Sequence, residues 1–261
     1  MPFPRLVVSL FALFPLFAGA ALADDRAGPR RFAVLSLIGD TMNVVTYQPA
    51  VAGNTDRNRR EAHSIPGGVF DRAALLAADA ALRQQDPHAA VILLTGSPAL
   101  YAEAERLADG ARLALPADLD AALKGQAATH LLLIRKHRAN ARLQAEGTLL
   151  GSGKLEGVGF YIDREKVMTR SDTGQRGEGF LGPYVYIKLA LVDLAAGTLL
   201  REVPVTGSTT VAAARSTDGD PWTALPDAQK VNALRGLIAR EVGQAVPKLL
   251  AQGSSPAPAP R

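Results

Sequence analysis

The chain contains no cysteine among its 261 residues. This absence excludes disulfide redox chemistry, catalysis by a thiol and zinc sites with cysteine ligands. It also excludes a lipid anchor attached to a cysteine. A chain of this length buries a core large enough to fold without disulfides, so the absence is compatible with an exported protein.

Histidine and aromatic residues are also scarce. The four histidines fit no metal-binding motif, and seven positions separate His130 from His137, which places them on opposite faces of a strand. We therefore expect no metal and no cofactor. Nucleic-acid-binding proteins concentrate positive charge and intersperse it with aromatic side chains. A net charge of +4 and an aromatic content of 5% argue against a nucleic-acid partner.

Acidic residues are missing from the first 23 positions. Arg5 precedes an apolar run over 6–22, and the small residues Ala21 and Ala23 stand just before Asp24. This pattern is typical of a secretory signal peptide cleaved after Ala23. The apolar run is short for a transmembrane helix. We expect a periplasmic mature chain without a transmembrane anchor.

The remaining sequence alternates between strand-like and helix-like segments. Short apolar or alternating runs predict strands at 32–38, 44–47, 89–94, 130–134, 158–162, 184–193 and 199–206. Helical spacing and proline or serine start signals predict helices at 69–85, 98–108, 117–125 and 226–249. Segments 49–68, 164–182 and 207–222 are polar and are expected to be loops, and Pro204 marks an edge strand.

This order predicts an α/β (α+β) fold, with a mixed β-sheet flanked by helices. We expect a single domain over 24–252 that ends in a long C-terminal amphipathic helix. The Ser/Pro/Ala-rich residues 253–261 are expected to be a disordered tail.

A glycine-rich stretch is the strongest candidate for a functional surface. Nine glycines fall between Gly147 and Tyr186, and each costs backbone entropy on folding. A close-packed hairpin and a loop that orders on a partner both explain them. The aromatic residues of this stretch are candidate binding residues: Phe160, Tyr161, Phe180, Tyr184 and Tyr186.

Two basic clusters are candidate contacts for an anionic partner. The first consists of Arg57, Arg59 and Arg60. The second runs from Arg135 to Arg142. If the second cluster continues a strand, alternation divides its side chains between the two faces. Ordinary solvated surface is the alternative for both clusters.

Two catalytic or phosphate-binding motifs are incomplete. The segment from Gly147 to Lys154 is similar to a phosphate-binding loop, but its spacing is one residue too long and Leu155 replaces the required hydroxyl. The turn Gly39-Asp40-Thr41 is similar to the start of some secreted esterases, with threonine at the serine position. A hydrolase would need a distant base such as His63.

The segments Ala128-Thr-His-Leu-Leu-Leu-Ile134, Tyr186-Ile-Lys-Leu-Ala-Leu-Val-Asp193 and Gly197-Thr-Leu-Leu200 carry a family resemblance. This pattern resembles the periplasmic α/β domain of the curli-assembly lipoproteins. It is also similar to the activator lipoproteins of penicillin-binding proteins and the amino-terminal domain of the Tol-system β-propeller protein. The resemblance implies an accessory role through protein contacts, without catalysis.

Together these patterns predict an exported, non-enzymatic accessory or binding protein of the bacterial cell envelope. Its expected partner is an envelope protein. The alternatives are a secreted esterase-like hydrolase and a protein that binds a small molecule or glycan. The sequence does not indicate an oligomeric state.

Overall fold

The computed structural model describes residues 30–49, 56–109, 112–145, 147–170 and 172–251. The predicted signal peptide (1–23) and tail (253–261) lie outside the described residues. The first strands are β1 (Arg31–Leu37), β2 (Thr41–Thr46), β3 (Arg59–Ser64), β4 (Ala90–Leu94), β5 (Ala108–Asp109), β6 (Arg112–Leu113), β7 (His130–Lys136), β8 (Arg138–Asn140) and β9 (Leu143–Ala145). The later strands are β10 (Thr148–Leu150), β11 (Lys154–Thr169), β12 (Arg176–Asp193), β13 (Thr198–Ser208) and β14 (Val211–Ala212).

The helices are α1 (Val69–Gln85), α2 (Pro98–Glu103), α3 (Ala117–Gly125) and α4 (Asp227–Leu250), with 3-10 turns η1 (Ala213–Arg215) and η2 (Pro221–Ala224). Each of the four α-helices begins within a residue of its predicted start. Within the described part of the chain, no helix combines the length and hydrophobicity needed to cross a bilayer.

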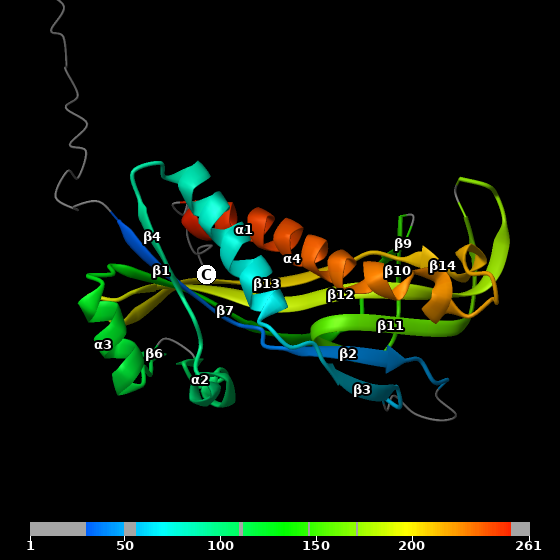
Figure 1. Ribbon diagram of the computed structural model, residues 1–261, viewed down its shortest axis with the longest axis horizontal. Coiled ribbons are helices and arrows are strands. Elements are labelled where there is room, and N and C mark those ends of the chain that lie inside the picture. The colour runs from blue at the N-terminus through cyan, green and yellow to red at the C-terminus, as the bar shows by residue number, and fades with distance from the viewer. Residues whose placement is uncertain (1–29, 50–55, 110–111, 146, 171, 252–261) are drawn as a thin grey trace, which may run out of the picture.

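The long strand β12 joins the two halves of one mixed sheet (Figure 1). Its C-terminal half pairs with β7, and β7, β1 and β4 run parallel to one another. Its N-terminal half pairs with β11, which is parallel to β2, and β2 pairs with β3. β13 lies along the other edge of β12. The predicted mixed sheet with flanking helices in one domain is confirmed.

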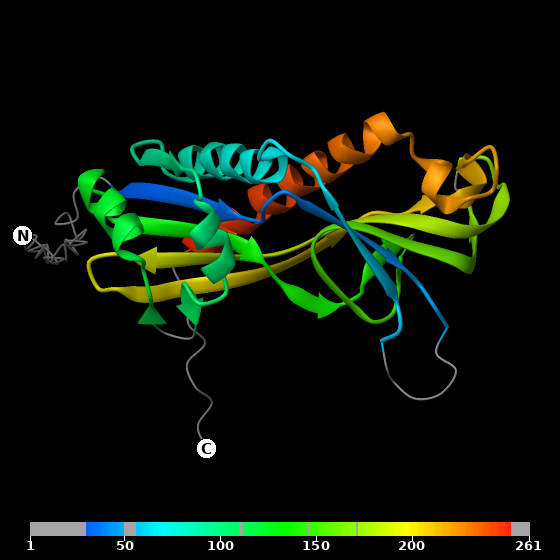
Figure 2. The same ribbon diagram turned by 60° about the horizontal axis from the view of Figure 1, so that its bottom comes forward.

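Helices α1 and α4 pack against each other and cover one face of the sheet (Figure 2). Their apolar residues recur at helical spacing, so each helix buries one stripe: Phe70 and Ala74 on α1, and Leu234, Ile238 and Val242 on α4. These side chains share a core with the sheet residues that point toward them. The largest hydrophobic cluster of the fold therefore lies between this helix pair and the sheet.

Alternation along β11 divides the sheet into a helix-covered face and an opposite face. Val158, Phe160 and Ile162 belong to the core under α1 and α4. Gly159 and Tyr161 point the other way, because successive side chains of a strand alternate between faces. Tyr161 belongs to a separate, smaller core on that opposite face.

Asp71 in the first turn of α1 fixes the end of β1. It is 6% exposed and accepts hydrogen bonds from the Ser36 hydroxyl (2.6 Å), the Ile38 amide (2.8 Å), the Gly39 amide (3.0 Å) and the Tyr101 hydroxyl (2.8 Å). The helical pattern alone places Asp71 away from the apolar face. The structure instead buries it as the acceptor that satisfies four donors.

Three segments expected to be loops contain regular structure. Within 49–68, β3 pairs with β2 as an exposed edge strand, and its polar residues hide the strand pattern. Most of 164–182 extends the β11–β12 ribbon. Within 207–222, the chain forms β14 and two 3-10 turns. Pro204 itself lies on an unpaired side of β13: the strand pairs with β12 along its length, and among the described residues its other side pairs with β6 at Thr198 alone, so the edge prediction holds at Pro204 although β6 and β5 follow β13 in the sheet order.

Candidate functional site

A hollow lined by basic side chains lies on the face of the sheet opposite α1 and α4. Its volume is about 330 Å³. We call it the cationic hollow, and its lining residues are Thr41, Asn43, Val45, Arg60, Lys136, Arg138, Lys154, Glu156 and Tyr184. Four of these side chains are cations and one is a carboxylate, so the lining favours anions.

The floor of the hollow is a row of register partners across three strands. Asn43 on β2 is opposite Gly159 on β11, and Gly159 is opposite Tyr184 on β12. Register partners project to the same face of a sheet. A Cβ on Gly159 would lie 1.9 Å from the Asn43 carbonyl oxygen and 2.9 Å from the Tyr184 hydroxyl. Only glycine therefore fits at this position.

Gly157, two residues earlier on β11, is required by its backbone conformation and lies beside a basic side chain. Its φ of +67° lies in the left-handed region, which favours glycine. A Cβ at this position would lie 3.4 Å from the Cδ of Lys136. Of the glycines in this stretch, Gly159 thus lets Tyr184 lie close to the β11 backbone, and Gly157 supplies a left-handed backbone conformation beside Lys136.

Asp56 holds one wall of the hollow in place. Its carboxylate accepts hydrogen bonds from the guanidinium of Arg60 (2.5 Å) and from the backbone amide of Lys154 (2.8 Å). Arg60 also donates to the Lys154 carbonyl (3.0 Å). Burial alone would raise the pKa of Asp56, but these hydrogen bonds lower it below its ordinary value. The contacts tie β3 to the start of β11.

The remaining cations are only partly compensated. Arg138 on β8 is the register partner of Glu156 on β11, and their charged groups are 3.9 Å apart. Among the residues that the structure describes, the ammonium groups of Lys136 and Lys154 have no carboxylate within ion-pair distance. The hollow therefore keeps an excess of positive charge.

The hydroxyl of Tyr184 is a buried donor at the floor of the hollow. The side chain is 0% exposed, and the hydroxyl has no hydrogen-bond partner in the described part of the chain. Burial raises the pKa of Tyr184, with Arg60 acting against this and Tyr186 and Glu156 adding to it. The phenol thus stays protonated near neutral pH and can donate a hydrogen bond.

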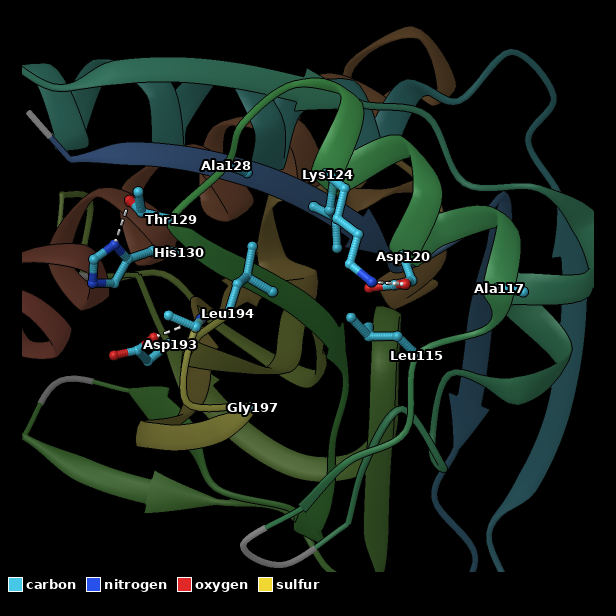
Figure 3. Close-up of a pocket in the computed structure, with 12 residues that line it drawn as sticks. Leu115, Ala117, Asp120, Lys124, Ala128, Thr129, His130, Asp193, Leu194 and Gly197 are labelled. Carbon is cyan, nitrogen blue, oxygen red and sulfur yellow. Dashed lines mark hydrogen bonds and ion pairs between the residues drawn. The ribbon is translucent and has the colours of Figure 1, made fainter.

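A second, larger cavity of about 760 Å³ lies between α3, the start of β7 and the β12–β13 turn (Figure 3). We call it the apolar cleft, because leucine and alanine side chains dominate its lining: Leu115, Ala117, Leu123, Ala128, Leu194 and Ala195. Asp120 and Lys124 form an ion pair on α3 (2.6 Å). Figure 3 shows this pair across the cleft from Thr129 and His130.

The polar groups of the apolar cleft serve the local structure. The Thr129 hydroxyl lies 2.8 Å from Nδ1 of His130, and it also accepts from the Arg31 amide (2.9 Å). Asp193, the register partner of His130, accepts from the amides of the β12–β13 turn. Burial lowers the pKa of His130, with Arg30 adding to this effect and Asp193 opposing it. A neutral imidazole therefore faces a mostly apolar cavity.

The structure buries all five aromatic residues that the sequence suggested as binding residues. Phe160, Tyr161, Phe180, Tyr184 and Tyr186 are each 0% exposed. As an exposed aromatic surface, this prediction is wrong, because strand alternation directs these rings into the two cores of the sheet. Of the five, Tyr184 lines the cationic hollow.

The two basic clusters have different outcomes. Arg60 of the first cluster lines the cationic hollow, Arg59 pairs with Glu61 (2.6 Å), and Arg57 is exposed. In the second cluster, Arg135 is 2% exposed and pairs with Glu202 (2.9 Å), whereas the next residue, Lys136, lines the cationic hollow.

The three residues of the esterase alternative do not form one network. Thr41 is the register partner of Ser64, whereas His63 is the partner of Met42, so His63 and Thr41 point to opposite faces. Asp40 accepts from the Gly68 amide (3.0 Å), and His63 lies 3.9 Å from Glu61. This hydrolase prediction is therefore wrong.

The described ranges contain no group of three or more histidine, aspartate or glutamate side chains arranged to hold a metal ion. Asn43 is a residue of the hollow that the sequence patterns did not single out. Lys136 belongs to a recognised basic cluster, Gly157 and Gly159 to the glycine-rich stretch, and Lys154 to the incomplete phosphate-binding motif, but the position of Asn43 beside Gly159 depends on the pairing of β2 with β11.

Comparisons with known proteins give neither a family nor a curated relative for this chain: no family model and no curated protein matches it. Among solved structures, it is similar to PelC from Paraburkholderia phytofirmans, with 12% identity, a TM-score of 0.33, and coverage of 86% of this chain and 90% of that chain. It is also similar to a neuraminyllactose-binding hemagglutinin homolog from Helicobacter pylori, with 9% identity, a TM-score of 0.37 and 86% coverage of both chains. A third similar structure is a Xanthomonas campestris protein, with 8% identity, a TM-score of 0.36, and coverage of 85% of this chain and 86% of that chain.

These similarities are too distant to assign a ligand or a partner to this chain. None of the three structures belongs to the curli-assembly, activator or Tol-system families. The resemblance to those families stays a prediction from the sequence.

Proposed function

We propose that the protein is an exported, non-enzymatic accessory protein of the bacterial cell envelope that acts by binding an anionic envelope component. The observation that carries this proposal is the cationic hollow. Segments far apart in the sequence supply Arg60, Lys136 and Lys154 to one concave surface. Such a surface attracts and orients anions, which is a binding function.

The proposed location in the cell envelope is supported by the signal-peptide pattern of residues 1–23. The resemblance of 128–134 and 186–200 to envelope accessory domains supports the same role. A contact through protein surfaces is the form of binding that this resemblance implies. Binding of a small anionic molecule is a second candidate, and the small volume and buried tyrosine of the hollow favour it.

The test is capture of partners from a cell-envelope extract by the full chain. The double variant Lys136→Glu/Lys154→Glu reverses two charges in the hollow. The control variant Lys166→Glu reverses one charge at an exposed position of β11 outside the hollow. The proposal expects the wild type and Lys166→Glu to retain the same acidic component and the double variant to lose it. Retention of every component by a correctly folded double variant would contradict the proposal.

A salt titration adds an independent readout. Because exposed charges are screened at high ionic strength, capture through the hollow should weaken as salt is added. A folded state equal to that of the wild type, checked by circular dichroism and thermal unfolding, is required of each variant.

A further inference from the structure

We propose that the cationic hollow is a phosphate subsite, in which the Tyr184 hydroxyl donates to a phosphate oxygen and Lys136 and Lys154 balance the charge. This inference rests on the proposed function and names the chemical class of the ligand. The ligand carries a phosphomonoester group, either on a small soluble molecule or on a lipid headgroup.

The Tyr184 hydroxyl is a hydrogen-bond donor without an acceptor among the described residues. Tyr184 is 0% exposed and lines the hollow. A buried polar group without a partner is costly, and such groups in native proteins call for an explanation. A bound anion supplies the missing acceptor, and hydrogen bonds to charged acceptors are stronger than neutral ones.

The backbone around this hydroxyl is close and fixed. Gly159 is the register partner of Tyr184, and the absence of a Cβ there, which would lie 2.9 Å from the Tyr184 oxygen, lets the hydroxyl lie close to the β11 backbone. Asn43, on the other side of Gly159, holds its amide toward the Glu156 carbonyl (3.2 Å). The hydroxyl therefore lies over bare backbone between fixed neighbours.

The charge balance favours a phosphate group over a carboxylate. Glu156, the one carboxylate of the lining, lies 3.9 Å from Arg138, and Asp56 behind the wall is bonded to Arg60. The two carboxylates thus neutralise the charge of the two guanidinium groups. The ammonium groups of Lys136 and Lys154 remain available to an anionic ligand. A phosphate monoester carries a charge of about −1.5 to −2 at neutral pH and three acceptor oxygens, which matches two ammonium groups and one phenol.

The size of the hollow limits the ligand. A volume of about 330 Å³ lies near the lower end of small-molecule sites, which begin at roughly 300 Å³. The hollow therefore holds a phosphate with a small attached group rather than a long polymer segment.

The test is isothermal titration of the full chain with inorganic phosphate and with glycerol 3-phosphate, using acetate as the carboxylate comparison. We expect Tyr184→Phe to weaken phosphate binding about tenfold, the effect of losing one hydrogen bond to a charged group. We expect Lys136→Gln/Lys154→Gln to weaken it at least as much. The control Lys166→Gln should bind as the wild type does.

Flotation with phosphatidylcholine vesicles, with and without phosphatidic acid, separates the two ligand sources. Binding of glycerol 3-phosphate alone supports a soluble ligand, and binding that requires phosphatidic acid and depends on Tyr184 supports a headgroup. Equal phosphate binding by the wild type, Tyr184→Phe and the double lysine variant would overturn the subsite.

Failure of this inference is distinguishable from failure of the proposed function. If the lysines are needed to capture an envelope component but no phosphate probe binds, the subsite is wrong and the proposed function stands. If acetate binds as well as phosphate does, the assignment to phosphate is likewise wrong. We expect Tyr184→Phe to unfold at a melting temperature no lower than that of the wild type, because the variant removes an unpaired hydroxyl and keeps the ring.

Discussion

Gly159 and Tyr184 are register partners in the β11–β12 ladder, and the absence of a side chain at Gly159 lets the Tyr184 hydroxyl lie close to the β11 backbone. On its other side, Gly159 pairs with Asn43 of β2. One residue without a side chain thus lets three strands meet at the floor of the cationic hollow. This relationship links the glycine content of β11 to the shape of the candidate site.

Gly159→Ala should destabilise the protein strongly. Its Cβ would lie 1.9 Å from the Asn43 carbonyl oxygen, so the backbone of β2 or β11 has to move. Overpacking of this kind costs about 1–3 kcal/mol or more. Gly236→Ala on α4 is the control, because no atom lies within 4 Å of its Cβ position, and alanine there should stabilise the helix by about 0.5–1 kcal/mol. Chemical denaturation measures both changes, and equal effects would contradict the prediction.

Tyr186→Phe should destabilise the protein and Tyr184→Phe should not, although both tyrosines are fully buried. The Tyr186 hydroxyl accepts from the Arg142 amide (2.8 Å) and donates to the Asn140 carbonyl (3.2 Å). Its loss leaves these groups unpaired and should cost about 1–3 kcal/mol. The Tyr184 hydroxyl has no such partner in the described chain, so its removal should leave the free energy of unfolding unchanged or raise it. A matching loss in both variants would show that Tyr184 has an acceptor.

Asp71→Ala should lower the free energy of unfolding by about 3 kcal/mol, because it removes the acceptor of four donors around the end of β1. Asp71→Asn keeps one acceptor oxygen and should fall between this variant and the wild type. The control is Asp79→Ala on the same helix. Asp79 pairs with Arg83 at i,i+4 (2.7 Å), and such a pair contributes about 0.3–0.5 kcal/mol. Equal losses for Asp71→Ala and Asp79→Ala would refute the role of Asp71.

Local sequence pattern predicted the helices and the mixed sheet because their signals lie within one segment. The apolar stripe of α4 and the alternating pattern of β12 each repeat over many residues. Every position in such a segment therefore indicates the same type of secondary structure. The sequence missed β3 because every residue of that strand is exposed, and an edge strand without a buried face shows no alternation. Asp71 was missed because its four partners come from β1, the turn after it and α2.

The candidate site was less accessible to sequence reasoning. Aromatic residues near glycines suggested a surface, but register decides whether a ring points into a core. Tyr186 packs with the buried cluster of Leu143 and Leu155, which belong to strands whose pairing no local pattern reveals. Lys136 was recognised in a basic cluster, but the antiparallel pairing of β8 with β11, which sets the place of Lys154 and Glu156 beside β8, is not visible in the local sequence.

The pKa of His130 predicts how stability changes with pH. Burial, with the nearby Arg30, holds this pKa below its ordinary value of 6.5 despite Asp193. The unfolded chain therefore binds a proton more readily than the folded chain does. The stability contributed by the neutral imidazole is fully present above pH 6.5 and is lost as the pH falls through 6.5 toward the folded pKa. His137 has a pKa lowered chiefly by burial and should act in the same direction.

We expect the free energy of unfolding to fall between about pH 7.5 and about pH 5, and His130→Gln to reduce that fall. His130→Gln/His137→Gln should reduce it further. The carboxylates with lowered pKa values, Asp56 and Glu202, titrate below their ordinary values of 3.8 and 4.5, so they contribute outside this window. Urea denaturation at a series of pH values measures the slope. A slope that stays the same in the double variant would mean that neither histidine is buried in its neutral form, because a buried neutral imidazole must be protonated when the chain unfolds in acid.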